Sequence, residues 1–445
     1  MNNARTVHIK SFGCQMNKLD TSLVASALRE AGFAFTESVK EADVVVINTC
    51  SVREHAEARV MSHLGHLKHA RKHRPDMIVA VIGCMAQRLG ESLLAHDVVN
   101  VVCGPGQIPQ LVHLIEEAFA SNAKRMAVAD VIRDPEDSSS DALEQFESAY
   151  GHEGEEGRAL RGQAFVRVMR GCDNFCTYCI VPYVRGPEQC RPPARILDQV
   201  RRLADEGIRQ VTLLGQTVNS YRYRNGQKTC SLADLLGMVA EVEGIEWIRF
   251  VTSYPSEEFY DDILHAMASS PKVCHYLHMP AQSGSDRILR AMNRHYTAEQ
   301  YLELLARARR IVPDIAIAGD FIVGFPGETD EDFQATVDLV QQARYRNCFV
   351  FKYSPRPGTT ADKRHRDCVP DEVKQRRNVE LLAVQEAVSE RLSRGFLGRI
   401  VRVLVEGPSK KAHVNPTDAH SHPQLVGRTA TDCIVVFNGS PSLAG

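Results

Sequence analysis

Three closely spaced cysteines are the clearest candidates for metal chemistry in this sequence. Cys172, Cys176 and Cys179 lie in the stretch MRGCDNFCTYCIVPYVRG, with three and then two residues between them. Thiolates at such short spacing bind zinc or an iron–sulfur cluster. Structural zinc normally has four protein ligands, but this loop holds no histidine and the next cysteine is Cys190. The spacing of this loop trio therefore favours a cluster that has one iron without a protein ligand.

A second set of three cysteines is dispersed along the first hundred residues. Cys14, Cys50 and Cys84 each follow a short apolar run that predicts a strand. The carboxyl ends of strands in an open parallel sheet line one crevice, so this strand-end trio is expected to converge there. Gly13 and Gly83 directly precede two of the thiols and allow a close approach of the backbone to a ligand. The alternative is three unrelated buried thiols. Small polar neighbours that could hydrogen-bond the sulfur atoms are Asn48, Thr49 and Ser51.

The elements that must position these cysteines begin with an alternation of strand and helix patterns. A helical stripe of Leu19, Leu23 and Ala27 follows the first apolar run. The runs are short and continuous, which is typical of strands covered on both faces. We therefore predict a doubly wound, parallel α/β domain over residues 1–125. Its strands are expected at Val7–Ile9, Val44–Ile47, Ile78–Ile82 and Val98–Val102.

A polar segment separates this domain from a second α/β region. Residues 126–162 are rich in Asp, Glu, Ser and Gly, and we predict an acidic linker or surface loop there. Residues 163–396 contain six βα units, which indicates a partly open (β/α)6 barrel whose last helix spans Asp371–Arg394. Its strands are expected at Ala164–Met169, Gln210–Leu214, Trp247–Thr252, His275–Met279, Ala316–Val323 and Phe349–Tyr353.

The remaining residues, 397–445, predict a small β unit. RIVRVLVEG and DCIVVF have strand patterns, and there is room for two or three strands, so the unit needs to pack on the rest of the chain. No apolar run reaches the roughly 18 residues of a membrane span, and the first residues lack the apolar core of a secretory signal. We therefore expect a cytoplasmic protein. In that reducing compartment, metal binding explains thirteen cysteines better than disulfides do.

Charge gives little information about partners. The net charge of −2 provides no overall attraction to nucleic acid. Two basic clusters, His66–Arg74 and Lys363–Arg366, could bind phosphates, but such runs are more often solvated helix faces.

The loop trio, placed after the first barrel strand, resembles the CxxxCxxC motif of the radical S-adenosylmethionine (SAM) superfamily. In that superfamily the open iron of a [4Fe–4S] cluster binds the amino and carboxylate groups of SAM. Further motifs between Thr6 and Ala361 resemble the methylthiotransferases within it. These are SFGCQMNKLDT, NTCSVREHAEARV, GCMAQR, GCDNFCTYCIVPYVRG, LLGQTVNSY, HMPAQSGSDRILRAM, FIVGFPGET and YSPRPGTTA.

This resemblance implies two [4Fe–4S] clusters, one on the loop trio and an auxiliary one on the strand-end trio. It also implies a C-terminal TRAM unit that binds tRNA. The end at Gly445 falls before the strands that usually complete TRAM, so the unit is expected to be truncated. By resemblance, four residues at the barrel strand ends line SAM, although each could instead cap a helix or fill the core: Gln216, Ser253, Gln282 and Val323. Tyr178, just before the third cysteine of the loop trio, is expected to pack beside the adenine of SAM, or otherwise to be a half-buried aromatic with its hydroxyl in water.

Within the family, GCQMN at Cys14 resembles the tRNA branch, which forms 2-methylthio-N6-isopentenyladenosine beside the anticodon. There a radical derived from SAM removes the hydrogen at carbon 2 of adenine, and a methylated sulfur takes its place. The implied partners are the tRNA anticodon stem-loop, an electron donor protein and a sulfur or Fe–S delivery system, with no membrane. Alternatives are the same chemistry on a ribosomal protein aspartate or on threonylcarbamoyl-adenosine, a non-catalytic Fe–S sensor that binds RNA, and a zinc-bound scaffold.

Several other residues are candidates for substrate contact or departures from the family pattern. Arg185 and Arg356 could contact phosphate or carboxylate groups, or each could equally form a surface ion pair. Tyr183 and Tyr221 could stack on a base that is splayed out of the RNA. Cys190 stands where the family usually has serine, and a thiol forms weaker hydrogen bonds than a hydroxyl.

Overall fold

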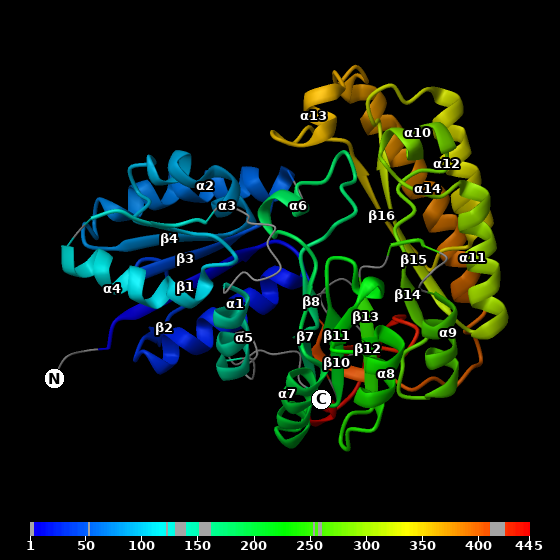
Figure 1. Cartoon of the computed structure of the whole chain (residues 1–445), viewed down its shortest axis with the longest axis horizontal. Coiled ribbons are helices and arrows are strands. Elements are labelled where there is room, and N and C mark those ends of the chain that lie inside the picture. The colour runs from blue at the N-terminus through cyan, green and yellow to red at the C-terminus, as the bar shows by residue number, and fades with distance from the viewer. Residues whose placement is uncertain are drawn as a thin grey trace. The chain divides into compact units, whose positions relative to one another are not determined.

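The computed structural model describes residues 4–51, 54–121, 123–129, 139–150, 162–251, 254–256, 260–409 and 423–445. The chain divides into two compact units (Figure 1). The first comprises residues 1–159, 165–174 and 180–191, and the second comprises residues 160–164, 175–179 and 192–445. Among the described residues, no helix is long and apolar enough to cross a membrane.

The first unit is built on a six-stranded parallel sheet in the order β2-β1-β3-β4-β5-β6. Every residue of β3 and β4 is buried, which agrees with their continuous apolar runs. The strands are β1 (Thr6–Phe12), β2 (Ala34–Phe35), β3 (Val44–Thr49), β4 (Ile78–Gly83), β5 (Val101–Cys103) and β6 (Arg125–Ala127). The helices are α1 (Gln15–Glu30), α2 (Glu54–Arg71), α3 (Cys84–Leu94), α4 (Leu111–Ser121) and α5 (Ser139–Tyr150).

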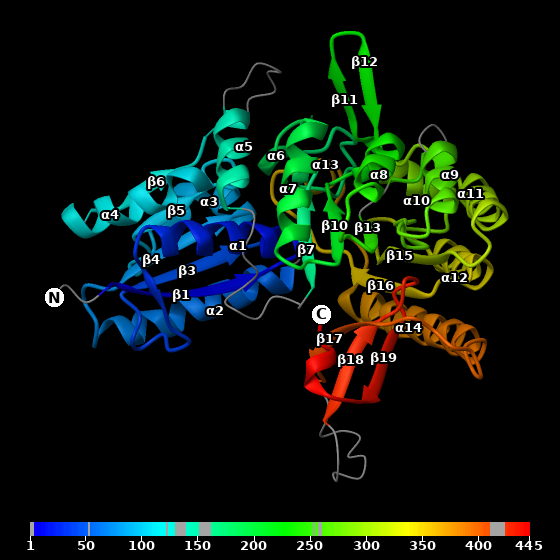
Figure 2. The same ribbon diagram turned by 90° about the horizontal axis from the view of Figure 1, so that it is seen from below.

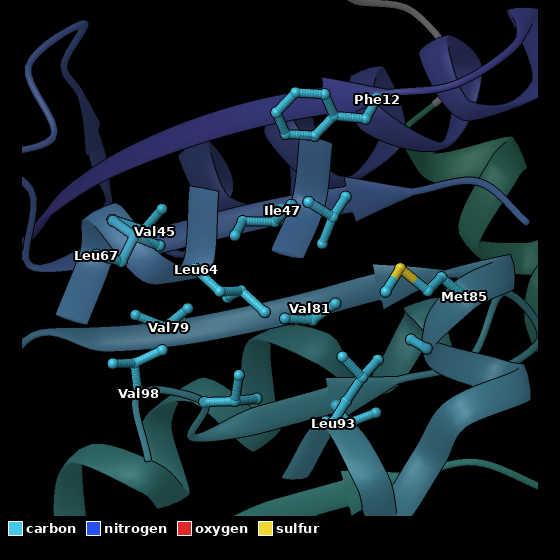
Figure 3. Close-up of a cluster of buried hydrophobic side chains, with 14 of the residues drawn as sticks. Phe12, Val45, Ile47, Leu64, Leu67, Val79, Val81, Met85, Leu93 and Val98 are labelled. Carbon is cyan, nitrogen blue, oxygen red and sulfur yellow. The ribbon is translucent and has the colours of Figure 1, made fainter. Parts of the chain in front are cut away.

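Helices cover both faces of this sheet, as the doubly wound prediction requires (Figure 2). Helix α2 packs its Val60, Leu64 and Leu67 on the strands, and these side chains form a dry core with Val45 and Val79 (Figure 3). Helices α1 and α4 lie on the opposite face. The core therefore anchors the strands whose carboxyl ends carry the strand-end trio.

The structure corrects the prediction that residues 126–162 form a linker or loop. Met126 and Ala127 are the last two residues of strand β6, and Ser139–Tyr150 is helix α5. Leu143, Phe146 and Glu147 of α5 are buried. Apolar side chains three residues apart lie on one helix face, a pattern that the acidic composition of the segment obscured. Residues 130–138 and 151–161, on either side of α5, lie outside the described residues.

The predicted strands of the barrel form two three-stranded sheets, β13-β10-β7 and β14-β15-β16. All of these strands lie in the second unit except β7, whose residues 165–167 are counted with the first unit. The isolated parallel bridge Ile248–Val273 lies between them. The strands are β7 (Gln163–Arg167), β10 (Gln210–Leu214), β13 (Trp247–Val251), β14 (Tyr276–His278), β15 (Ala316–Val323) and β16 (Asn347–Lys352). The helices are α7 (Pro193–Asp205), α8 (Leu232–Ala240), α9 (Tyr260–Ser269), α10 (Asp286–Ala291), α11 (Ala298–Ile311), α12 (Asp330–Ala343), α13 (Thr360–Arg364) and α14 (Asp371–Arg394).

The C-terminal β unit is a three-stranded antiparallel sheet, β17-β18-β19. Its strands are β17 (Leu404–Pro408), β18 (Gln424–Arg428) and β19 (Ile434–Asn438). It packs on the barrel, since Arg249 of β13 donates a hydrogen bond to Thr429 O at 2.5 Å and Arg346 donates one to Cys433 Sγ at 2.8 Å. A sheet of this size therefore gains the support that it needs from the second unit.

Shorter elements complete the chain. In the first unit, β8 (Met169–Arg170) pairs with β9 (Gln189–Cys190), and helix α6 (Val181–Val184) lies between them in sequence. In the second unit, β11 (Arg222–Asn225) and β12 (Lys228–Ser231) form a hairpin that projects from the barrel in Figure 2.

Candidate functional site

The strand-end trio converges because of the register of three neighbouring strands. Phe12 of β1 pairs with Thr49 of β3, and Thr49 pairs with Gly83 of β4, so these three residues form one row across the sheet. Cys50 and Cys84 come one residue beyond this row, and Cys14 comes two residues beyond it. The parallel sheet thus delivers three thiols to its carboxyl edge, as the sequence predicted.

Two glycines and an asparagine allow this close approach. A Cβ on Gly13 would lie 2.9 Å from the Cβ of Cys50 and 2.4 Å from Asn17 Oδ1. Gly83 has φ +95°, and a Cβ there would lie 2.5 Å from Thr49 O. Asn17 Oδ1 accepts a hydrogen bond from Cys14 Sγ at 3.2 Å, and its Nδ2 donates to Asn48 Oδ1 at 2.9 Å. The sequence indicated Asn48 as a hydrogen-bond partner of the cysteine sulfurs, but it did not identify Asn17 in that role.

The surroundings of the trio favour the thiolate form at Cys14. A hydrogen bond from Cys50, together with the smaller effect of the Arg185 guanidinium, lowers the pKa of the Cys14 thiol to about 6, although burial acts in the opposite direction. Burial raises the pKa of Cys84, while Arg185 opposes that rise. Cys14 is also the N-cap of α1, and Cys84 is the first residue of α3. Helix N-termini stabilise negative charge, so these positions suit thiolate ligands.

Arg185 and Asp20 form a buried ion pair beside the trio. Arg185 Nη2 lies 2.9 Å from Asp20 Oδ2, and Arg185 Nε donates to Cys84 Sγ at 3.3 Å. The Asp20 side chain is fully buried and that of Arg185 is 5% exposed. The sequence proposed that Arg185 contacts a phosphate or a carboxylate. In the structure its carboxylate partner is Asp20, which belongs to the same unit.

The loop trio is divided between the two units. Cys172 belongs to the first unit, where its N–H donates to Gly186 O at 3.1 Å and Asn174 Nδ2 donates to its sulfur at 3.4 Å. Cys176 and Cys179 belong to the second unit, where the N–H of Cys179 donates to Cys176 O at 2.9 Å. Among the described residues, no group of three or more Cys, His, Asp or Glu is arranged to hold a single metal ion. A cubane distributes its three thiolates over three irons.

A second buried arginine lies beside the loop trio. Arg294 Nη1 donates to Cys176 Sγ at 3.4 Å, Nη2 to Pro280 O at 2.9 Å, and Nε to Tyr296 Oη at 2.8 Å. Its guanidinium carbon lies 4.2 Å from the centroid of the Tyr254 ring, a cation–π contact. Arg294 lies in the motif-flanking stretch AMNRHY, but sequence reasoning did not single it out.

Three of the residues proposed to contact SAM, Gln216, Gln282 and Val323, lie at or after carboxyl ends of barrel strands. Gln216 follows β10, and its Oε1 is buried without a hydrogen-bond donor among the described residues. Gln282 has φ +71°, an uncommon conformation for a residue other than glycine, and it forms an isolated parallel β-bridge with Phe321 of β15. Val323 ends β15 and is fully buried. Tyr178 is half-buried and packs against an apolar cluster that includes Phe325. Ser253 lies outside the described residues.

Other candidates from the sequence have different outcomes. Tyr221 is 1% exposed, so the structure contradicts its proposed role as a stacking platform for a base. Tyr183 is 41% exposed and keeps an accessible ring. Arg356 is buried, and its Nη1 donates to Ser354 Oγ at 2.7 Å within its own turn. Cys190 in β9 pairs with Met169 of β8.

Comparison with protein families gives two matches. Residues 6–104 match the family described as "Uncharacterized protein family UPF0004", and residues 166–340 match the radical SAM superfamily. The first match includes the strand-end trio, and the second includes the loop trio and Arg294.

Several curated proteins are similar over nearly the whole chain. A tRNA-2-methylthio-N(6)-dimethylallyladenosine synthase of Rhodopirellula baltica is 42% identical over 99% of this chain and 91% of its own length. Synthases with the same name from Acetivibrio thermocellus and Haemophilus influenzae are 42% and 41% identical, over 98% and 99% of this chain and 86% and 88% of their own lengths.

Solved structures share the fold at lower identity. The radical S-adenosylmethionine methyltransferase TsrM from Kitasatospora setae, with cobalamin and a [4Fe–4S] cluster bound, has a TM-score of 0.58 and 15% identity. The match covers 81% of this chain and 77% of TsrM. The cobalamin-dependent S-adenosylmethionine radical enzyme OxsB has a TM-score of 0.51 and 14% identity, over 87% of this chain and 56% of OxsB.

Proposed function

The chain belongs to the radical SAM methylthiotransferase family, among the tRNA-2-methylthio-N(6)-dimethylallyladenosine synthases, and we propose that it performs their reaction. The product is the 2-methylthio derivative of an N6-isopentenylated adenosine next to the tRNA anticodon. The observation that carries this proposal is the identity of 42% over 99% of the chain with such a synthase. The convergence of the strand-end trio supports it, because sulfur insertion needs a second cluster in addition to the one that holds SAM.

The residues present fit two clusters and SAM. Cys14, Cys50 and Cys84 would hold the auxiliary [4Fe–4S] cluster, and the loop trio would hold the other cluster together with SAM. When bound, these groups supply the radical removal of a hydrogen from carbon 2 of adenine and the sulfur that replaces it. The Oε1 of Gln216, which accepts no hydrogen bond from the described residues, offers an acceptor to a ligand at the carboxyl end of β10.

The protein itself holds the thiolates and excludes water. Arg294 donates to Cys176 and Arg185 donates to Cys84, and both guanidinium groups are buried. Charge-assisted hydrogen bonds of this kind stabilise a thiolate and fix its orientation. Tyr178 would pack beside the adenine of SAM, and Gln282, Val323 and Ser253 would line the same end of the barrel.

This proposal assigns roles to the parts of the chain. Residues 1–125 form the auxiliary-cluster domain, residues 126–162 connect it to the barrel of residues 163–396, and residues 397–445 form a TRAM-like unit that binds tRNA. Reduction of a cluster requires an electron donor protein, and replacement of the sulfur requires a sulfur or Fe–S delivery system. Since the anticodon stem-loop of tRNA is the substrate, we infer a cytoplasmic location.

Iron analysis and a tRNA assay test the proposal. Protein purified without oxygen should contain about eight irons per chain, which is two clusters of four. Replacement of Cys14, Cys50 and Cys84 by alanine should remove about four of them. Cys103→Ala is the matched control, because Cys103 is a buried thiol at the end of β5 in the same sheet. Its iron content should equal that of the unchanged protein.

The activity assay then identifies the substrate. With SAM, a reductant and isopentenylated tRNA, the modified nucleoside should gain the mass of a methylthio group. The same tRNA without the isopentenyl group serves as the control substrate. A mass gain on a ribosomal protein, with none on tRNA, would contradict the proposal.

A further inference from the structure

One buried guanidinium beside the strand-end trio contacts a cysteine and a carboxylate at the same time. Arg185 Nε donates to Cys84 Sγ at 3.3 Å while Nη2 donates to Asp20 Oδ2 at 2.9 Å. The planar fork of an arginine can hold two partners in fixed directions, whereas the ammonium of lysine acts as a point charge on a flexible stem. The contact with Cys84 is therefore specific to arginine.

A chain of buried ion pairs holds the Arg185 guanidinium in place. Asp20, on α1, lies between Arg185 and Arg167, with Arg167 Nη2 3.3 Å from its Oδ1. Arg167 Nη2 is also 2.6 Å from Glu147 Oε1 on α5. All four side chains are 5% exposed or less. Buried charges are stable only when they are paired, so the contact with Asp20 holds the Arg185 guanidinium in the orientation in which its Nε meets Cys84.

The sequence connects this guanidinium to the loop trio. Arg185 follows α6 and comes six residues after Cys179. The segment that carries one set of cysteines therefore also supplies a cation to the other set. The alternative for Arg185, an ion pair at the protein surface, would not require these side chains to be buried and would contribute little to stability.

We propose that Arg185 is a positioning residue for the auxiliary cluster, one that hydrogen-bonds the Cys84 thiolate and raises the reduction potential of the group held by the strand-end trio. Asp20 and Arg167 keep its guanidinium in place. The inference rests on the proposed function, because it requires a cluster at this trio. A hydrogen bond and a positive charge at a ligand sulfur favour the reduced, more negative state of a cluster, and this sets the direction of the effect.

The experiment isolates the auxiliary cluster in the full-length chain. Cys172, Cys176 and Cys179 are replaced by alanine, and the protein is reconstituted with ferrous iron and sulfide without oxygen. In this parent protein two changes at Arg185 are compared. Arg185→Lys keeps the charge but loses the two-directional fork, and the double change Arg185→Gln with Asp20→Asn removes a positive and a negative charge together. The double change protects the test from misfolding caused by an unpaired buried charge.

Arg74→Lys is the matched control. Arg74 also pairs with an aspartate of the first unit, Asp43, at 2.5 Å, but that pair is partly exposed. Asp43 directly precedes β3, at the end of the strand opposite Cys50. Far-UV circular dichroism checks the fold of each variant. The measurements are iron and sulfide content, the rate of iron release to a ferrous chelator, and the midpoint potential from a redox titration followed by electron paramagnetic resonance.

Both Arg185 variants should show a lower midpoint potential than the parent. They should also bind iron about ten-fold more weakly or worse, as is typical when a partner of a metal ligand is lost, and therefore release it faster. Arg74→Lys should match the parent in both measurements. A midpoint potential that is unchanged in a folded Arg185 variant would overturn the inference, whatever the rate of iron release, because a purely structural ion pair would not set the potential. A parent protein that binds no iron would overturn the proposed auxiliary cluster itself.

Discussion

Replacement of Asp20 by asparagine should strongly destabilise the first unit. The Asp20 carboxylate is fully buried between Arg185 at 2.9 Å and Arg167 at 3.3 Å. Each attraction amounts to about 5–6 kcal/mol at an effective dielectric constant of about 20. The carboxylate also loses its hydration, so the net cost of removing one partner of a buried pair is about 3–5 kcal/mol. Asparagine keeps the shape of the side chain but leaves two buried cations with less compensation.

Urea unfolding followed by two probes measures this loss of stability for the first structural unit separately from the second. The protein has one tryptophan, Trp247, which lies in the second unit, so its fluorescence reports on that unit alone. Far-UV circular dichroism reports on both units. With a urea dependence of about 2 kcal/mol per molar, Asp20→Asn should lower the midpoint of the first unit by roughly 1.5–2.5 M. The transition seen by Trp247 fluorescence should not move.

Asp97→Asn is the control, because Asp97 pairs with Lys68 at the surface of the same unit, with side chains 76% and 60% exposed. Exposed pairs contribute little, so this change should leave both transitions in place. The reasoning would be refuted if Asp20→Asn shifted the dichroism transition no more than Asp97→Asn does.

Three further predictions concern the site and the second unit. Cys14→Ala should still cleave SAM to 5′-deoxyadenosine but form no methylthio product, both measured by mass spectrometry; loss of both activities would indicate a structural role for the strand-end trio. Burial raises the pKa of Glu328 to about 7, against the hydrogen bonds from Gly324 and Arg377. Because this folded-state pKa is above the ordinary value of 4.5, the stability that Glu328 contributes is complete below about pH 4.5 and is lost as the pH rises through about 7. The stability advantage of the unchanged protein over Glu328→Gln should therefore shrink between these pH values in urea titrations followed by Trp247 fluorescence, and a constant difference would contradict the assignment. Gly284→Ala should destabilise the second unit by about 1–3 kcal/mol, because its Cβ would lie 2.2 Å from Ala335 O, whereas Gly237→Ala in α8, with open space around it, should be neutral or stabilising by up to about 1 kcal/mol.

Local patterns in the sequence predicted most of the fold. The continuous apolar runs of β3 and β4 identified buried parallel strands, and helix α14 has the bounds that its pattern indicated, Asp371–Arg394. These signals are carried by residues that are neighbours in the chain, so periodicity and end signals are sufficient to find them. Helix α5 was missed because an acidic composition concealed its short apolar stripe.

The sequence by itself also identified both cysteine trios as candidate cluster ligands, since each thiol stands in a recognisable motif or shortly after a predicted strand. Only the tertiary structure decided what surrounds them. Arg185 meets Asp20 across 165 positions of the chain, and Arg249 meets Thr429 across 180. Likewise, burial removed Tyr221 from the candidates for base stacking. Pairings over such distances depend on how strands and helices pack, and a charged or aromatic residue carries no local sign of the partner that packing will give it.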